Sequence, residues 1–247
     1  MSHIAAAPSL SRLADALDRH YALGGEADDG LAAWMQQTFT PACVLGLLDE
    51  VLANPDLLAE VAGRSYHHGN GFLKVVLANR QGWKLRLHIW FPDAPCEENI
   101  HDHRWSFAST VLCGALLSET FVDDPQGPVN GVEYLYHASQ GGDSSRKVAS
   151  GDFRLRSQGR TMRRAGEAYA LPSSVLHRIC DYTGKGLVAT MMCSAPTRQS
   201  TNRLLVSADH AGIDPNVEQN PLDPRELACL LARFSRAYVA TLHPLAA

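Results

Sequence analysis

The stretch GEAYALPSSVLH, residues 166–177, decides the fold expected for this chain. It follows the pattern Gly, five residues, Pro, one residue, Gly or Ser, two residues, His, which arises by chance in only ~0.006 of such chains. Pro172 and Ser174 suit a turn that leads into a strand, which places His177 on that strand. The stretch therefore predicts a turn-and-strand unit that presents one imidazole.

A series of short strand patterns surrounds this unit. Apolar and β-branched runs alternate with turn clusters such as DDPQGP at 123–128 and QGGD at 140–143. Many short strands without helices between them favour a sandwich or barrel over a parallel α/β sheet. The predicted strands are 72–77, 83–91, 106–122, 131–137, 153–156, 169–171, 175–180 and 187–194.

Both ends of the chain are predicted to be helical. The dipeptides Thr-Pro at 40–41 and Asn-Pro at 54–55 each combine an N-cap residue with proline at the first helical position. The sequence DPRE at 223–226 resembles a capping box ahead of an apolar stripe, so the last helix is expected to pack on the barrel, with self-association as the alternative. We expect one structural domain in three parts: an N-terminal helical extension (1–65), a β-barrel (66–210) and a C-terminal helical segment (211–247).

Composition and charge exclude several classes of function. The chain has 247 residues, of which 45% are hydrophobic and 19% charged, as in globular rather than disordered proteins. A net charge of −4 disfavours general binding to nucleic acids or anionic membranes. No apolar run approaches the ~20 residues of a membrane span, and the first ten residues lack a secretion-signal pattern. The six scattered cysteines suit reduced, buried thiols. We expect a cytoplasmic monomer or homodimer that acts on small molecules.

His101-Asp102-His103 is the second candidate element of a site. Residues two apart on a strand point to the same side, so His101 and His103 can both face a barrel interior together with His177. Three imidazoles on one side of a divalent metal leave its other side open for substrate. Asp102 points away by the same parity and is expected at the surface or behind a ligand. The alternative is three core histidines without a metal.

The two histidine segments resemble the two motifs of the cupins, a superfamily of jelly-roll barrels that usually hold one metal ion. The resemblance is to cysteine dioxygenase and the related thiol dioxygenases, and it covers roughly 72–205 plus an N-terminal helical preface. It implies a mainly β, double-stranded jelly roll. It also implies an Fe(II) site with three histidine ligands, because Phe107 stands where the general cupin pattern carries a glutamate. The similar segments are Ile100–His103 with Ser106, Leu112–Gly114, Glu119–Phe121, Leu176–Arg178 and Ser194–Pro196.

The departures from cysteine dioxygenases concern the substrate. Ala108 replaces the cysteine that can crosslink to an active-site tyrosine in those enzymes, and their Ser-x-His-x-Tyr run falls on Thr190, Met192 and Ser194. The arginine that grips the substrate carboxylate aligns with Lys74. We therefore expect little or no turnover of free cysteine, no Cys–Tyr crosslink, and a substrate larger than cysteine.

Seven residues are candidates for contact with that substrate. Arg86, His88 and Trp90 share one face of a predicted strand, which lines either the barrel or the solvent. Tyr169 is expected in the core or in the pocket wall. The arginines of 154–164 are expected on a solvated hairpin, with an anion or nucleic-acid site as the alternative, and His67-His68 in a loop without a role. The candidates are Lys74, Arg86, His88, Trp90, Trp105, Phe107 and Met192.

These features predict a non-heme Fe(II) oxygenase that uses O2 without an organic cosubstrate. Three neutral ligands leave the metal site dicationic, which favours a substrate that chelates the metal through a thiolate or another anionic donor. The alternative is a cupin that uses its metal without O2, as an isomerase or lyase, or that only binds a small ligand.

Overall fold

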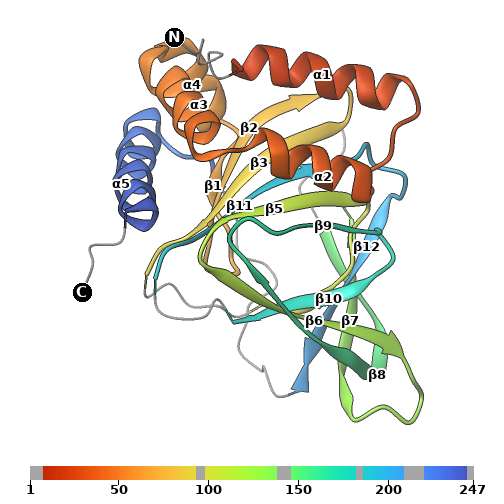
Figure 1. Cartoon of the computed structure of the whole chain (residues 1–247). Coiled ribbons are helices and arrows are strands. Elements are labelled where there is room, and N and C mark those ends of the chain that lie inside the picture. The colour runs from red at the N-terminus through yellow and green to blue at the C-terminus, as the bar shows by residue number, and fades with distance from the viewer. Residues whose placement is uncertain (1–7, 93–97, 138–145, 182–185, 209–219, 244–247) are drawn as a thin grey trace.

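The computed structural model describes residues 8–92, 98–137, 146–181, 186–208 and 220–243 (Figure 1). Four helices precede the strands and one follows them, so the predicted mainly β fold with helical ends is confirmed. The helices are α1 (Leu10–Ala22), α2 (Asp29–Thr38), α3 (Pro41–Ala53), α4 (Pro55–Ala62) and α5 (Pro224–Leu242). The strands are β1 (Tyr66–His67), β2 (Leu73–Arg80), β3 (Trp83–Trp90), β4 (Ile100–His101), β5 (Phe107–Cys113), β6 (Ala115–Asp123), β7 (Val129–His137), β8 (Arg146–Arg164), β9 (Ala168–Leu171), β10 (Leu176–Asp181), β11 (Val188–Ser194) and β12 (Thr201–Ser207).

The strands form two antiparallel sheets that make up the jelly roll. One sheet has the order β1-β2-β3-β11-β5-β9, and we name it the helix-covered sheet. The other closes on itself in the order β10-β4-β12-β7-β8-β6. Non-consecutive neighbours such as β3 and β11 show that the chain crosses between the sheets, as the resemblance to jelly-roll barrels implies.

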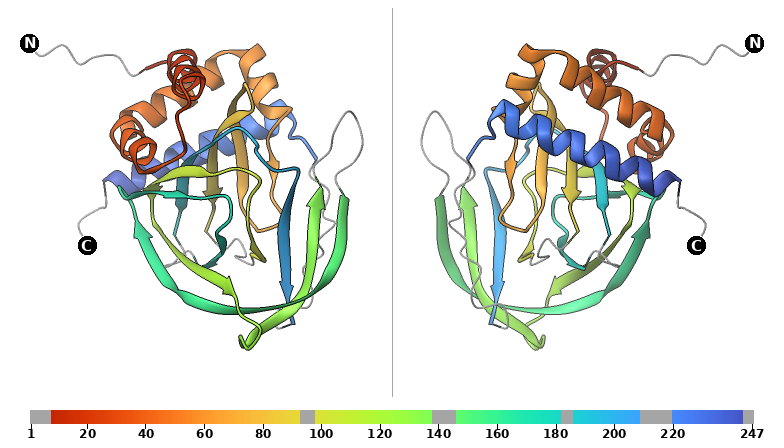
Figure 2. Two further views of the ribbon diagram at one scale, coloured as in Figure 1. Left: turned by 90° about the vertical axis from the view of Figure 1, so that its right-hand side faces the viewer. Right: turned by 90° about the vertical axis from the view of Figure 1, so that its left-hand side faces the viewer.

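The helices cover one face of the helix-covered sheet (Figure 2). Their N-caps follow the predicted chemistry: the side chains of Thr40, Asn54 and Asp223 accept hydrogen bonds from backbone N–H groups of the first turn. The buried stripe of α5 lies in the same core as the helix-facing residues of the sheet, so the prediction that α5 packs on the barrel assembly is confirmed. The division into three parts stays a prediction, and 211–219 lie outside the described residues.

The period of β3 decides which side chains reach the interior. Trp83, Leu85, Leu87 and Ile89 are fully buried in the core shared with the helices. Since side chains alternate along a strand, the other set faces the space between the two sheets. The prediction left the direction of this second set open, and the structure turns it inward.

Two predicted strands are wrong in extent. The single strand expected at 106–122 is broken into β5 and β6 at Gly114, whose φ is 72°. The short strand expected at 153–156 is part of β8, which runs for 19 residues because it pairs with β6 on one side and β7 on the other. Glycine and long-range pairing, rather than local propensity, set these limits.

Among the described residues, no helix is long and apolar enough to cross a membrane.

We expect Gly114→Ala to destabilise the fold by more than about 2 kcal/mol. An alanine at this positive φ costs about 1–2 kcal/mol, and its Cβ would lie 2.6 Å from the backbone oxygen of Leu187. Gly166→Ala is the matched control, because Gly166 also has a positive φ (86°) but nothing lies within 4 Å of the added carbon. Urea unfolding measures both variants; equal losses would show that the contact with Leu187 does not matter.

Candidate metal centre and cavity

A cavity of about 740 Å³ lies between the two sheets. Its walls come from every strand of the two sheets: β1, β2, β3, β5, β9 and β11 of the helix-covered sheet, and β4, β6, β7, β8, β10 and β12 of the closed sheet. The volume is in the range of pockets that hold small molecules.

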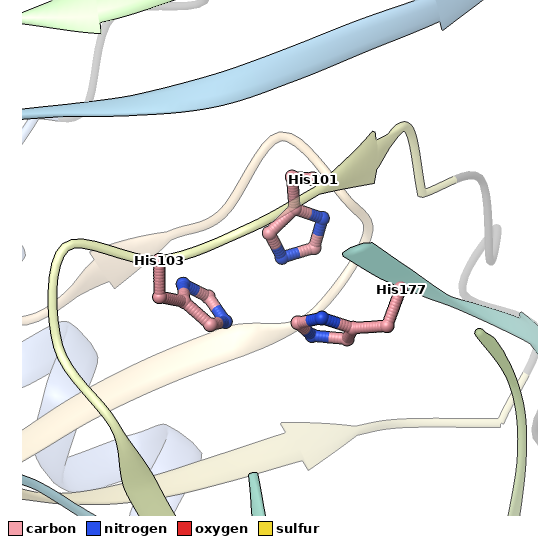
Figure 3. A group of neighbouring side chains, drawn as sticks. All are labelled: His101, His103 and His177. Atoms are coloured by element: carbon pink, nitrogen blue, oxygen red, sulfur yellow. The ribbon is translucent and has the colours of Figure 1, made fainter. Parts of the chain in front are cut away.

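The three predicted histidines meet in this cavity (Figure 3). His177 on β10 is the direct antiparallel partner of His101 on β4, and His103 follows two residues later. One ring nitrogen from each lies within 4.8 Å of the others, and the three form a group that could hold a metal ion. The strand register therefore brings together residues that are 74 to 76 positions apart in sequence.

Backbone carbonyls orient two of these rings. The Nδ1 of His101 lies 2.8 Å from the Asn99 oxygen, and that of His177 lies 3.0 Å from the Val175 oxygen. A carbonyl only accepts, so both Nδ1 atoms carry the proton and both Nε2 atoms keep a free lone pair. Fixing the tautomer in this way is what proteins commonly do for histidine ligands of metals.

His103 is oriented by an aromatic stack instead. Its ring is nearly parallel to that of Trp105, with the centroids 4.3 Å apart and an interplanar angle of 12°. The edge of Phe107 packs against it at 5.3 Å. The guanidinium of Arg86 lies over the Trp105 indole in a cation–π contact, with Cζ 4.4 Å from the ring centroid.

Burial keeps the imidazoles of His103 and His177 neutral. Desolvation, reinforced by the neighbouring His101, lowers the pKa of His177 to about 3, and the same two causes hold the pKa of His103 well below its usual range. Neutral imidazole is the form that binds metals, and it suits Fe, Zn, Cu and Ni. The donor set thus fits a divalent transition metal, and Phe107 supplies no fourth ligand.

Asp102 lies outside the histidine group, as its parity indicates, but it is not at the surface. The residue is 8% exposed, and its carboxylate accepts a hydrogen bond of 2.6 Å from the backbone N–H of Arg203. This hydrogen bond connects β12 to the segment that contains His101 and His103. Of the two positions expected for Asp102, at the surface or behind a ligand, the structure excludes the surface because β12 covers this segment.

All seven candidate substrate residues line the cavity. Arg86 is 6% exposed and donates to the Met192 sulfur at 3.7 Å. Burial lowers the pKa of Arg86 to about 10 and that of Lys74 well below its usual range. The Nζ of Lys74 donates to the Tyr66 hydroxyl at 3.1 Å. The residues are Lys74, Arg86, His88, Trp90, Trp105, Phe107 and Met192.

Several wall residues were missed or misplaced. His68 is not incidental, since its ring stacks on Phe72 at 4.5 Å and lines the cavity. Of the two positions expected for Tyr169, the structure gives the cavity wall. Arg163, from the arginine run, also lines the cavity, and its Cζ lies 4.1 Å from the Tyr169 ring centroid. Lys84 could have been found, because it has the parity of Arg86. Residues that line the cavity without a sequence signal of their own include Tyr66, Glu98, Asn99, Arg104 and Tyr136.

Comparison with known proteins gives matches among solved structures, and those described below have low sequence identity. No protein-family model matches the chain, and no curated protein does. Among solved structures, an oxalate oxidase in complex with glycolate shares 16% identity over 69% of this chain and 74% of that one, with a TM-score of 0.33. An oxalate decarboxylase shares 13% sequence identity over 58% of this chain and 30% of its own, with a TM-score of 0.32. A structure of DMSP lyases shares 11% sequence identity over 55% of this chain and 52% of the other, with a TM-score of 0.31. Because these likenesses are so low, the function proposed below rests on the side chains of this chain alone.

Trp105→Ala is expected to weaken the binding of a divalent metal about tenfold, because the stack that orients His103 is lost. Trp105→Phe, which keeps a ring at that place, is expected to restore most of the affinity. Trp90→Ala is the matched control, since Trp90 also lines the cavity but packs on His88 and Phe72 rather than on the three histidines. Anaerobic calorimetry with Fe²⁺ gives the affinities; an equal loss in both tryptophan-to-alanine variants would contradict the orienting role.

His88 makes the folding free energy depend on pH. Burial first, then Lys74 and Arg86, lower its pKa well below the usual 6.5, so the unfolded chain binds one more proton there as the pH falls below about 6.5. Stability is therefore lost toward acid, and His88→Gln should reduce the slope by close to one proton. Thr190→Val, at the position opposite His88 on β11, alters the same packing without removing a titratable group. Urea unfolding between pH 7.5 and 5 with a chelator measures the slopes; equal slopes in His88→Gln and the wild type would contradict the assignment.

Proposed function

We propose that the chain is a non-heme Fe(II) oxygenase of the cupin type that resembles the thiol dioxygenases and needs no organic cosubstrate. The observation that carries the proposal is the convergence of three histidines on one cavity, two of them fixed with Nε2 free. A 2-oxoglutarate-dependent site would need a carboxylate where His103 stands.

His101, His103 and His177 would hold the metal through ring nitrogens. When bound, Fe(II) supplies one-electron redox chemistry and open positions for ligands. The protein supplies the surroundings: Phe107 occupies the place of a fourth ligand, and Trp105 keeps the His103 ring in line. The apolar rings around the group also exclude water from one side of it, which strengthens every charge interaction inside.

The substrate is a small, metal-chelating anion larger than cysteine. The cavity of about 740 Å³ is of the size that holds drug-sized ligands. Lys74, Arg86 and His88 lie in its wall, where they can bind the polar end of such a molecule, and the last two are buried. The Nε2 of His88 is a buried polar atom without a partner among the described residues, as expected for a group that awaits a ligand.

For a thiol substrate the overall reaction is RSH + O2 → RSO2H. Both oxygen atoms enter the product, a sulfinic acid, so no external reductant is required. Arg86 and Lys74 hold the negative end of the substrate, and this fixes where its sulfur lies relative to the three histidines.

Oxygen uptake by the iron-loaded protein tests the proposal. Anaerobic loading should give one iron per chain, and an oxygen electrode should record uptake with a thiol larger than cysteine, such as glutathione, but little with cysteine itself. His177→Ala should lose both the iron and the uptake, because the remaining two imidazoles hold the metal too weakly.

The matched control is His67→Ala, which removes an exposed histidine that pairs with Glu226 on α5. It should keep the iron and the activity of the wild type. Full iron occupancy in His177→Ala would refute the ligand assignment. Bound iron without oxygen uptake across thiols from cysteine to tripeptide size would instead favour a metal-dependent isomerase or lyase.

A further inference from the structure

Three cationic side chains gather at one end of the cavity. Lys84 and Arg86 lie two residues apart on the inward face of β3, and Arg104 directly follows His103. The Cζ of Arg104 lies 5.9 Å from the ring centroid of Tyr136 on β7, which also lines the cavity. We name Lys84, Arg86 and Arg104 the cationic end of the cavity.

These cations are close enough to lower one another's pKa by electrostatic repulsion. After desolvation, Arg86 and Arg104 are the charges that lower the pKa of Lys84, and Arg104 also acts to lower the pKa of Arg86. Like charges in a half-buried place repel more strongly than in water. The native fold therefore holds three groups together at an electrostatic cost that an anion would offset.

No carboxylate compensates this end within the described part of the chain. None of the three cations forms an ion pair there, whereas Arg80 and Arg203 each pair with an aspartate. Glu98 is the acidic residue that lines the cavity, but its carboxylate accepts a hydrogen bond of 2.8 Å from the backbone N–H of Ile179 on β10. The counter-charge for the cationic end is missing from these residues.

A buried hydroxyl without a partner marks the same place. The Oγ of Ser194 has no hydrogen-bond partner among the described residues, although the residue is only 1% exposed. Ser194 lines the cavity and is the register partner of Lys84 on the neighbouring strand. A buried hydroxyl without a hydrogen-bond partner is unfavourable unless a ligand provides that partner. Ser194 therefore offers a hydrogen-bond donor to a ligand, in addition to the three cations.

We infer that Lys84, Arg86, Arg104 and Ser194 form a subsite for a dianionic group, either a phosphate ester or a pair of carboxylates, carried by the substrate. The inference rests on the proposed function, since the rest of that molecule reaches the three histidines. The two places are adjacent: Arg86 lies over the Trp105 ring, which is stacked on His103. Specificity then comes from charge as well as size, and a monoanionic thiol lacks the group that the subsite binds.

Anion binding to the metal-free protein tests this subsite apart from the iron chemistry. The protein is dialysed against a chelator and titrated calorimetrically with inorganic phosphate, succinate and acetate. We expect phosphate or succinate to bind at least tenfold more tightly than acetate; which of the two is preferred identifies the dianion. No preference for either dianion over acetate would overturn the inference.

Variants locate the binding. Lys84→Gln combined with Arg104→Gln should weaken dianion binding at least tenfold, and Ser194→Ala should weaken it several-fold. The matched control, Arg12→Gln with Arg19→Gln, changes the net charge equally at two exposed positions on α1. Equal weakening in the control pair, or none in the cavity pair, would overturn the inference.

His177→Ala separates this inference from the proposed function. This variant should lose iron but keep the affinity for the dianion. Loss of the dianion in His177→Ala would place the anion at the histidines and not at the cationic end. Dianion binding without oxygen uptake in the iron-loaded wild type would contradict the proposed oxygenase and leave the subsite standing.

Discussion

The two-residue alternation of β3 is the constraint on which the rest of the structure depends. Leu85, Leu87 and Ile89 are drawn beneath the helices by the burial of apolar area. The same strand must then direct Arg86 and His88 to the opposite side, into the space between the sheets. A shift of one residue in register would exchange the two sets, with charged groups under the helices and leucines in the cavity. The helical cover is thus part of what makes the cavity polar.

Within that cavity, burial lowers the pKa of histidine and arginine alike but leaves the two kinds of group in different charge states. It keeps the imidazoles of His103 and His177 neutral, which is the state in which they can donate a lone pair to a metal. Arg86, by contrast, keeps its charge at neutral pH, since its pKa falls only to about 10. One part of the cavity therefore offers neutral ligands and another offers fixed positive charge. A molecule that joins a soft donor to an anionic group matches both.

The sequence predicts those parts of the fold and site that depend on local periods. Because His101 and His103 are two residues apart, they are expected on the same side of the chain. The capping residues show where the helices begin. It does not predict what depends on which strands become neighbours. Arg104, Glu98 and Tyr136 reach the cavity only because β4, β7 and β12 lie side by side. Asp102 is buried for the same reason, and the need for glycine at 114 comes from Leu187 and Val188, which leave no room for a side chain there.

Among the described residues, the histidine group contains no carboxylate, and in the proposed enzyme this has an electrostatic consequence for the choice of substrate. In a site with a glutamate ligand, the protein itself cancels part of the charge of a divalent metal. In the proposed enzyme Phe107 stands at that position, so a bound metal would retain its full double charge beside Arg86. In a medium of low dielectric constant such a concentration of positive charge is unfavourable until an anion enters. The incoming substrate then becomes the missing counter-charge, and a neutral molecule of the same shape would leave the cations unpaired. If the proposed function holds, discrimination by charge follows from the phenyl ring of Phe107, which stands where the resemblance to cupins implies a glutamate ligand.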